Sequence, residues 1–146
     1  WQDKYYSQTK IKGVYCSDLM TFIKDPPAKL LIIDEHQNIS KLWEEAMAVF
    51  GDSLAITISC PEYLEFNHWE ATKGNGVKML VNMLGIPREQ VITIGDSFND
   101  ISMLKVAGLG VAVANAPDDV KAHADFITLP HNNDGVAHVI EKFILS

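Results

Sequence analysis

The chain has 146 residues, of which 47% are hydrophobic and 21% are charged. These proportions suit a folded protein with one modest core or two small ones, and they exclude a fibrous or disordered chain. The formal net charge is -7 at pH 7, so the chain lacks the positive charge that binding to nucleic acid or to an anionic membrane surface requires. We therefore expect a small ligand.

Two further features bound the cellular setting. The apolar runs are all much shorter than the roughly 20 residues that a membrane-spanning helix needs, and no secretory signal is visible. Cys16 and Cys60 stand alone, without a Cys-x-x-Cys pair or a Cys/His cluster, which does not suggest a disulfide scaffold. We therefore expect a cytoplasmic protein. The first residue is Trp1 rather than Met, so we also expect that the natural amino terminus lies upstream.

The first part of the chain predicts a small mixed unit. Residues 5–14 are compatible with a strand and residues 17–24 with a helix, before a break at Asp25-Pro26-Pro27. The apolar run at residues 30–34 predicts a strand. Ser40 is then expected to cap a helix that runs to Phe50 and stops at Gly51.

A hairpin is predicted next. Residues 54–59 and 63–67 both alternate between apolar and polar side chains with a period of two, and Cys60-Pro61-Glu62 between them is a plausible turn. Residues near this hairpin, including Phe66, His68 and Trp69, are expected to pack at a hinge, although contact with a substrate is an alternative.

From about Ala71 the pattern becomes a strict alternation of helices and short apolar strands. Helices are predicted near residues 77–84, 101–107, 117–124 and 136–144, and strands at residues 91–94, 110–114 and 126–129. Short apolar strands separated by helices are typical of a parallel sheet with helices on its faces. The predicted fold class is therefore α/β.

The candidate chemistry lies at residues 95–100, with the sequence Gly-Asp-Ser-Phe-Asn-Asp, directly after a predicted strand. In a parallel sheet, ligands bind where the strands end at their carboxyl edge. Asp96 projects at that edge and Asp100 follows one helical turn later, so the two carboxylates can share a face. Ser97, Asn99 and free backbone N–H groups would attract an anion. Carboxylates beside an anion site require a cation, and Mg²⁺ takes such oxygen ligands.

The alternative interpretation of this segment is an ordinary tight turn in which Ser97 or Asn99 caps a helix. A Gly-Asp pair at the end of a strand does not by itself distinguish the two interpretations. The surrounding motifs distinguish them.

A series of motifs in fixed order resembles the Cof-type branch, with cap type IIB, of the haloacid dehalogenase superfamily. The resemblance covers the following segments: Thr72-Lys73-Gly74, Leu84-Gly85-Ile86-Pro87, residues 91–100, Met103-Leu104, Ala107-Gly108, residues 111–116, Lys121, Ala124-Asp125 and residues 134–137. Residues 1–70 match only in outline, as the later part of the α+β cap that this branch inserts into its core. The expected domains are therefore a partial cap at residues 1–70 and the carboxyl-terminal part of the core at residues 71–146.

The resemblance implies a role for each matching residue. Lys73 corresponds to the cation that neutralises charge around the transferring phosphoryl group. Asp96 corresponds to the direct Mg²⁺ ligand, and Asp100 to a second acid that supports the metal through water or orients Lys73. Asn99 corresponds to an amide that contacts phosphate. Asn115 is expected to order the rim of the site, and a turn-forming role is the alternative.

The family's early motifs are absent from the sequence. The nucleophile of the family is the first Asp of an Asp-x-Asp motif, and neither Asp34-Glu35-His36 nor residues 14–18 match it. We therefore expect the chain to be the carboxyl-terminal portion of a longer enzyme. The strand at residues 91–94 should then have an unpaired edge, through which the chain would self-associate, swap or pair with the missing portion.

The sequence thus predicts that the complete protein is a Mg²⁺-dependent phosphatase. Its expected substrates are small phosphorylated metabolites such as sugar phosphates, and its aspartyl-phosphate would form on a residue outside this chain, which alone should be inactive. The alternative is a binding or regulatory relic of the same fold. A dinucleotide-binding enzyme is rejected, because Gly108-Leu109-Gly110 precedes a strand instead of opening a helix.

Overall fold

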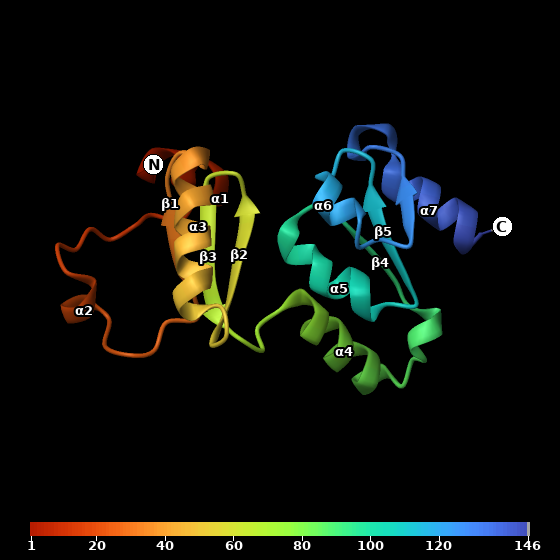
Figure 1. The fold of residues 1–146 in the computed structure, drawn as a ribbon, viewed down its shortest axis with the longest axis horizontal. Coiled ribbons are helices and arrows are strands. Elements are labelled where there is room, and N and C mark those ends of the chain that lie inside the picture. The colour runs from red at the N-terminus through yellow and green to blue at the C-terminus, as the bar shows by residue number, and fades with distance from the viewer. Residues whose placement is uncertain (146) are drawn as a thin grey trace.

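The computed structural model describes residues 1–145 and contains two three-stranded sheets that follow each other along the chain (Figure 1). The first is antiparallel, in the order β1-β3-β2, and consists of β1 (Leu30–Ile33), β2 (Leu54–Cys60) and β3 (Tyr63–His68). The second is parallel, in the order β4-β5-β6, and consists of β4 (Ile92–Gly95), β5 (Leu109–Val113) and β6 (Phe126–Thr128). The predicted α/β class, the hairpin and the parallel sheet are confirmed.

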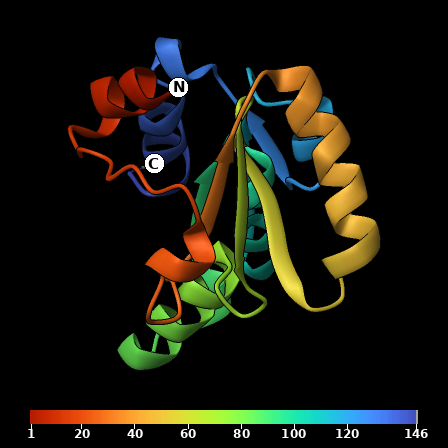
Figure 2. The same cartoon turned by 90° about the vertical axis from the view of Figure 1, so that its left-hand side faces the viewer.

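One face of the first sheet packs against a long helix, α3 (His36–Phe50). Because side chains alternate along a strand, Ile56 of β2 and Leu64 of β3 share a face, and both are buried with Ile39 and Ala46 of α3. Figure 2 shows α3 along one side of this sheet and the amino-terminal helix on the other. The first core is therefore one-sided.

Two predictions in this region are wrong. Residues 2–9 form a helix, α1 (Gln2–Thr9), where part of a strand was expected, because contacts with the distant hairpin override the local pattern. Lys4 pairs with Glu62 at 2.8 Å, and the ring of Tyr5 lies 6.3 Å from that of Tyr63. A short helix, α2 (Leu19–Phe22), falls within the predicted residues 17–24.

The start of α3 is the second correction. The helix begins at His36, one turn before Ser40, with Glu35 as the flanking residue. Ser40 therefore lies inside the helix, where its hydroxyl donates to the carbonyl of His36 at 3.0 Å. A serine can cap a helix, or it can lie inside the helix and donate a hydrogen bond to a carbonyl of the preceding turn. The sequence alone does not separate these two positions. Gly51 ends the helix as predicted.

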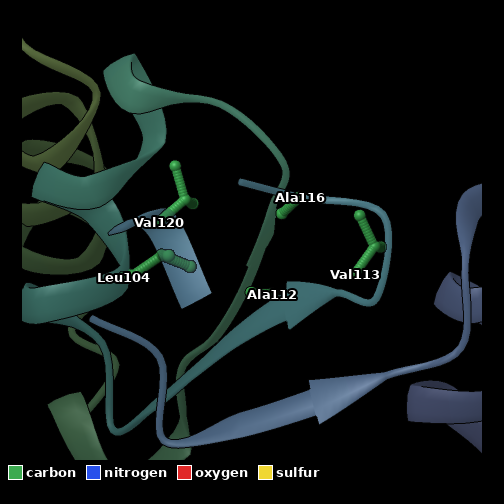
Figure 3. Close-up of a cluster of buried hydrophobic side chains, with 5 residues drawn as sticks. All are labelled: Leu104, Ala112, Val113, Ala116 and Val120. Atoms are coloured by element: carbon green, nitrogen blue, oxygen red, sulfur yellow. The ribbon is translucent and has the colours of Figure 1, made fainter. Parts of the chain in front are cut away.

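The second sheet carries its helices on both faces (Figure 1). These are α4 (Lys73–Leu84), α5 (Ile101–Val106), α6 (Asp118–Lys121) and α7 (Gly135–Phe143), with short 3₁₀ turns at Arg88–Gln90, Phe98–Asp100 and His131–Asn133. The central strand β5 is buried along most of its length. Its side chains form a core with α5, α6 and the loop that joins β5 to α6: Leu104, Ala112, Val113, Ala116 and Val120 (Figure 3).

Strand β4 lies at the edge of the second sheet, as predicted, and within residues 1–145 no strand pairs with its outer side. The nearby helix α4 leaves large apolar side chains exposed: Met79, Leu80, Met83 and Leu84. No helix among the described residues has the length and apolarity needed to cross a membrane.

Candidate active site

The candidate site forms at the carboxyl end of β4, where the chain turns sharply back on itself. A Cβ atom on Gly95 would lie 2.5 Å from the Cβ of Asp100 and 2.9 Å from its Oδ2 atom. No side chain fits in that space, so only glycine lets the loop of residues 95–100 close this tightly.

Asp100 anchors the loop from within. Its side chain is nearly fully buried, and its Oδ2 atom accepts hydrogen bonds from the backbone N–H groups of Asp96 at 2.9 Å and Ser97 at 3.0 Å. Hydrogen bonds to a charged acceptor are stronger than neutral ones, so this carboxylate holds the strand end and the loop as one unit. Ser97 is the N-cap residue of the 3₁₀ turn, as the alternative interpretation expects, and its backbone N–H donates to the Asp100 carboxylate there.

Lys73 reaches the same carboxylate from α4. Thr72 caps that helix by accepting from the backbone N–H of Asn75 at 3.1 Å. Gly74 brings α4 against α5, because a Cβ there would lie 2.4 Å from the carbonyl oxygen of Ser102. With the helix so placed, the Lys73 ammonium forms an ion pair with Oδ1 of Asp100. The structure thus brings together two predicted site residues that are 27 positions apart in sequence.

Asp96 and Asn99 present groups without protein partners. Asp96 is exposed, and within residues 1–145 its carboxylate makes no hydrogen bond or ion pair. The Oδ1 atom of Asn99 is buried and has no hydrogen-bond partner among the described residues. Because a buried, unpaired polar atom costs free energy, it suggests a ligand or water that this atom would contact.

The donor set only partly suits a metal ion. Within residues 1–145 no three His, Cys, Asp or Glu side chains gather closely enough to hold one. Asp96 offers a free carboxylate, whereas both oxygens of Asp100 already accept from Lys73 and from backbone amides. Mg²⁺ usually binds one or two protein carboxylates together with waters and substrate phosphate. Asp96 therefore fits as one ligand of a set that these residues do not complete.

Asn115 makes a separate contact. Its Oδ1 atom accepts from the backbone N–H of His131 at 2.8 Å, which ties the loop after β5 to the loop after β6. No hydrogen bond in the described structure joins Asn115 to Lys73 or Asp100. An ordering role at the rim stays a prediction.

A cavity of about 470 Å³ adjoins this group and has walls from both halves of the chain. The second half contributes Lys73, Asn99 and neighbouring residues of α5, while the first half contributes Thr57, Glu65 and Asn67 of the hairpin. The Ser97 hydroxyl also links the halves, because it donates to the carbonyl oxygens of Ile58 and Ser59 at 3.4 and 3.3 Å.

Sequence reasoning missed the hairpin wall of this cavity. Its signal was the alternation of β2 and β3, which places polar residues opposite the apolar face that α3 covers. Without the position of the second half, nothing in the sequence indicated what that polar face looks onto.

Comparison with known proteins identifies the family of the chain. The sequence pattern of the haloacid dehalogenase-like hydrolases matches residues 2–140. The chain is 45% identical over 92 residues to the 5-amino-6-(5-phospho-D-ribitylamino)uracil phosphatase YcsE of Bacillus subtilis, a match that covers 63% of this chain and 37% of YcsE. Two other curated bacterial relatives, from Bacillus subtilis and Haemophilus influenzae, are each matched over 44% of their length. The chain thus spans less than half of the length of these relatives.

Solved structures show the same fold. A haloacid dehalogenase-like hydrolase from B. subtilis superposes with a TM-score of 0.79 at 31% identity, over 97% of this chain and 50% of that protein. A sugar phosphatase of haloacid dehalogenase subclass IIB superposes with a TM-score of 0.81 at 24% identity, over 97% of this chain and 53% of that protein. At this identity the second likeness concerns the fold alone.

Proposed function

Because this chain belongs to the haloacid dehalogenase-like hydrolases, in their Cof-type phosphatase branch, we propose that the complete protein is a Mg²⁺-dependent phosphatase. Its substrates would be small phosphorylated metabolites such as sugar phosphates. The observation that carries the proposal is the Lys73–Asp100 ion pair beside the free carboxylate of Asp96. It puts a cation and an unpaired carboxylate near the carboxyl edge of a parallel sheet, where ligands bind.

Each residue has a separate task in this proposal. Asp96 would hold the metal, and the bound Mg²⁺ would neutralise negative charge on the substrate phosphate. Asp100, whose oxygens are already engaged, would orient Lys73 so that the ammonium faces the phosphoryl oxygens. Asn99 would satisfy its buried Oδ1 atom through a water or a protonated group of the ligand. Asn115 would order the rim.

The proposal divides the protein into parts. Residues 1–70 would belong to a partial cap, and residues 71–146 to the carboxyl-terminal part of the catalytic core. The nucleophilic Asp would lie outside this chain, so the chain alone would bind Mg²⁺ weakly and hydrolyse nothing. The outer edge of β4 would then pair with the missing portion or with a second copy. Cytoplasmic reducing conditions would keep Cys16 and Cys60 as the free thiols seen in the structure.

The test is a kinetic comparison in the complete protein with an aryl phosphate and Mg²⁺. Asp96→Asn and Lys73→Met should each lower kcat/KM by about a hundredfold or more, since each removes charge stabilisation of the transition state. Asp119→Asn is a matched control, because Asp119 is an exposed carboxylate on α6. Full activity in Asp96→Asn would contradict the proposal. A folded parent without any hydrolysis would favour the non-catalytic relic instead.

A further inference from the structure

The polar face of the hairpin is built opposite its apolar face. In the register of β2 and β3, Thr57 lies across from Glu65 and Ala55 lies across from Asn67. Their side chains therefore share one face of the sheet, and all four residues line the cavity that also contains Lys73 and Asn99. A carboxylate on this wall thus looks into the same space as the candidate phosphate-binding groups.

The carboxylate of Glu65 is held in place by its neighbours. The Ser59 hydroxyl donates to its Oε1 atom at 2.8 Å, and the Lys29 ammonium lies 3.0 Å from the same oxygen. Only 17% of the Glu65 side chain is exposed, compared with 46% for Lys29. The acceptor is therefore fixed before any ligand arrives, which reduces the ordering cost of a hydrogen bond to it.

The same neighbours keep the group ionised. Burial acts to raise the pKa of Glu65, but hydrogen bonds from Ser59, Lys29 and Asn67 outweigh it, so this pKa lies below its ordinary value. At neutral pH the wall therefore presents a carboxylate, which accepts hydrogen bonds and donates none.

The charged residues of opposite sign lie on opposite walls of the cavity. Lys73, already paired with Asp100, and Lys105 on α5 are the cations among its lining residues, and both belong to the second half. Glu65 is the anion on the opposite wall. When a phosphate monoester places its anionic group toward Lys73 and Asn99, the rest of the molecule faces the Glu65 carboxylate. That part must therefore carry no negative charge, or must donate hydrogen bonds to Glu65.

We propose that Glu65 is a specificity-determining residue that accepts hydrogen bonds from hydroxyl or ammonium groups on the leaving group of the substrate. Ser59 and Lys29 are positioning residues, since they act by orienting Glu65. The inference rests on the proposed phosphatase function, because it concerns the part of the substrate that does not react. The competing explanation is that the Ser59–Glu65–Lys29 group only stabilises the sheet.

The test compares two substrates in the complete protein with Mg²⁺. Glucitol 6-phosphate carries hydroxyl donors on its leaving group, whereas phenyl phosphate carries none. Glu65→Gln should lower kcat/KM for glucitol 6-phosphate by about tenfold, mainly through KM, because a charged acceptor is lost. With phenyl phosphate its kcat/KM should stay within about twofold of the parent, because that leaving group offers Glu65 no hydrogen-bond donor.

Two further variants separate recognition from folding. Glu62→Gln is the matched control, because Glu62 lies at the hairpin turn and pairs with Lys4 outside the cavity, so both substrates should be unaffected. Lys29→Met leaves the carboxylate but loosens it, and should give a smaller, equally selective loss. Its activity toward phenyl phosphate reports whether the protein is folded.

Each outcome decides between the claims. A selective loss in Glu65→Gln supports the assignment. Equal losses with both substrates, or no loss with either, overturn it and leave the phosphatase proposal standing. A parent that hydrolyses phenyl phosphate but not glucitol 6-phosphate, nor an amino-alkyl phosphate, also overturns the assignment alone. A parent that hydrolyses none of these esters overturns both claims.

Discussion

The two halves of the chain bury their sheets in different ways. In the antiparallel half, β2 and β3 each bury one residue, Ile56 and Leu64, on the side that α3 covers. In the parallel half, β5 is buried from Gly110 to Val113, because helices cover both of its faces. A one-sided sheet retains a polar face, whereas a two-sided sheet offers polar groups only at the ends of its strands.

This difference explains how the site is divided. The parallel half supplies Asp96 and Asp100 in the loop after β4, and Lys73 at the start of α4. The antiparallel half supplies a wall, since the sheet face opposite α3 carries the polar side chains that line the cavity. In the proposed function, the phosphate group of a substrate would thus bind beside the parallel sheet, and its leaving group would contact the antiparallel sheet.

The largest expected effects come from truncating one core at a time. Leu64→Ala and Leu104→Ala should each destabilise the protein by about 2–5 kcal/mol, because both side chains are fully buried. If the halves are separate cores, hydrogen exchange should show lost protection mainly in the half that carries the substitution. Equal loss of protection in both halves after either substitution would contradict two separate cores and indicate one cooperative unit.

A smaller effect concerns the placement of α4. Gly74→Ala should cost about 1–3 kcal/mol in the free energy of unfolding, because the new methyl group collides with the backbone of Ser102. Gly76 lies in the same helix with nothing within 4 Å of a Cβ, so Gly76→Ala should instead stabilise by up to about 1 kcal/mol. Chemical denaturation of the pair measures the difference, and equal effects would show that α4 is not fixed by close contact.

The contact of Ser97 with the hairpin, which links the two halves, should contribute less to the free energy of unfolding. Ser97→Ala removes the polar N-cap side chain and its hydroxyl contacts with the hairpin, and should cost about 0.5–2 kcal/mol. Hydrogen exchange of the Ser59 to Tyr63 region should increase at the same time. An unchanged hairpin would mean that the two halves do not support each other through this contact.

The smallest expected effect is the pH dependence of the hairpin wall. The pKa of Glu65 is lowered in the folded protein, so its stabilising contribution is present above its unfolded pKa and is lost as pH falls through the lower folded value. The effect is small because the half-exposed Lys29 is screened by solvent. Acid titration of stability should be flatter in Glu65→Gln than in the parent, and parallel curves would contradict the assignment of this group.

Sequence patterns predicted most of the fold where local and tertiary preferences agree. The hairpin and the alternating helices and strands after Ala71 are of this kind. Residues 2–9 were missed because α1 depends on contacts with Glu62 and Tyr63, far away in the sequence. The start of α3 was placed late because Ser40 bonds to the preceding turn from inside the helix.

The candidate site was predictable in part for the same reason. The spacing of residues 95–100 pointed to the loop, and the family resemblance added Lys73, which the structure joins to Asp100. The wall at Glu65 was not predictable, because it depends on how the hairpin faces the second half. A polar residue on a strand indicates an uncovered face, but it does not indicate what lies opposite.

The most direct test of the account is a phosphate-release assay of this chain and of the complete protein, side by side, with an aryl phosphate and Mg²⁺. We predict that the complete protein hydrolyses the ester, that Asp96→Asn lowers this activity by about a hundredfold or more, and that the isolated chain releases no phosphate. Hydrolysis by the isolated chain that disappears in Asp96→Asn would contradict the claim that this chain forms only one wall of the site.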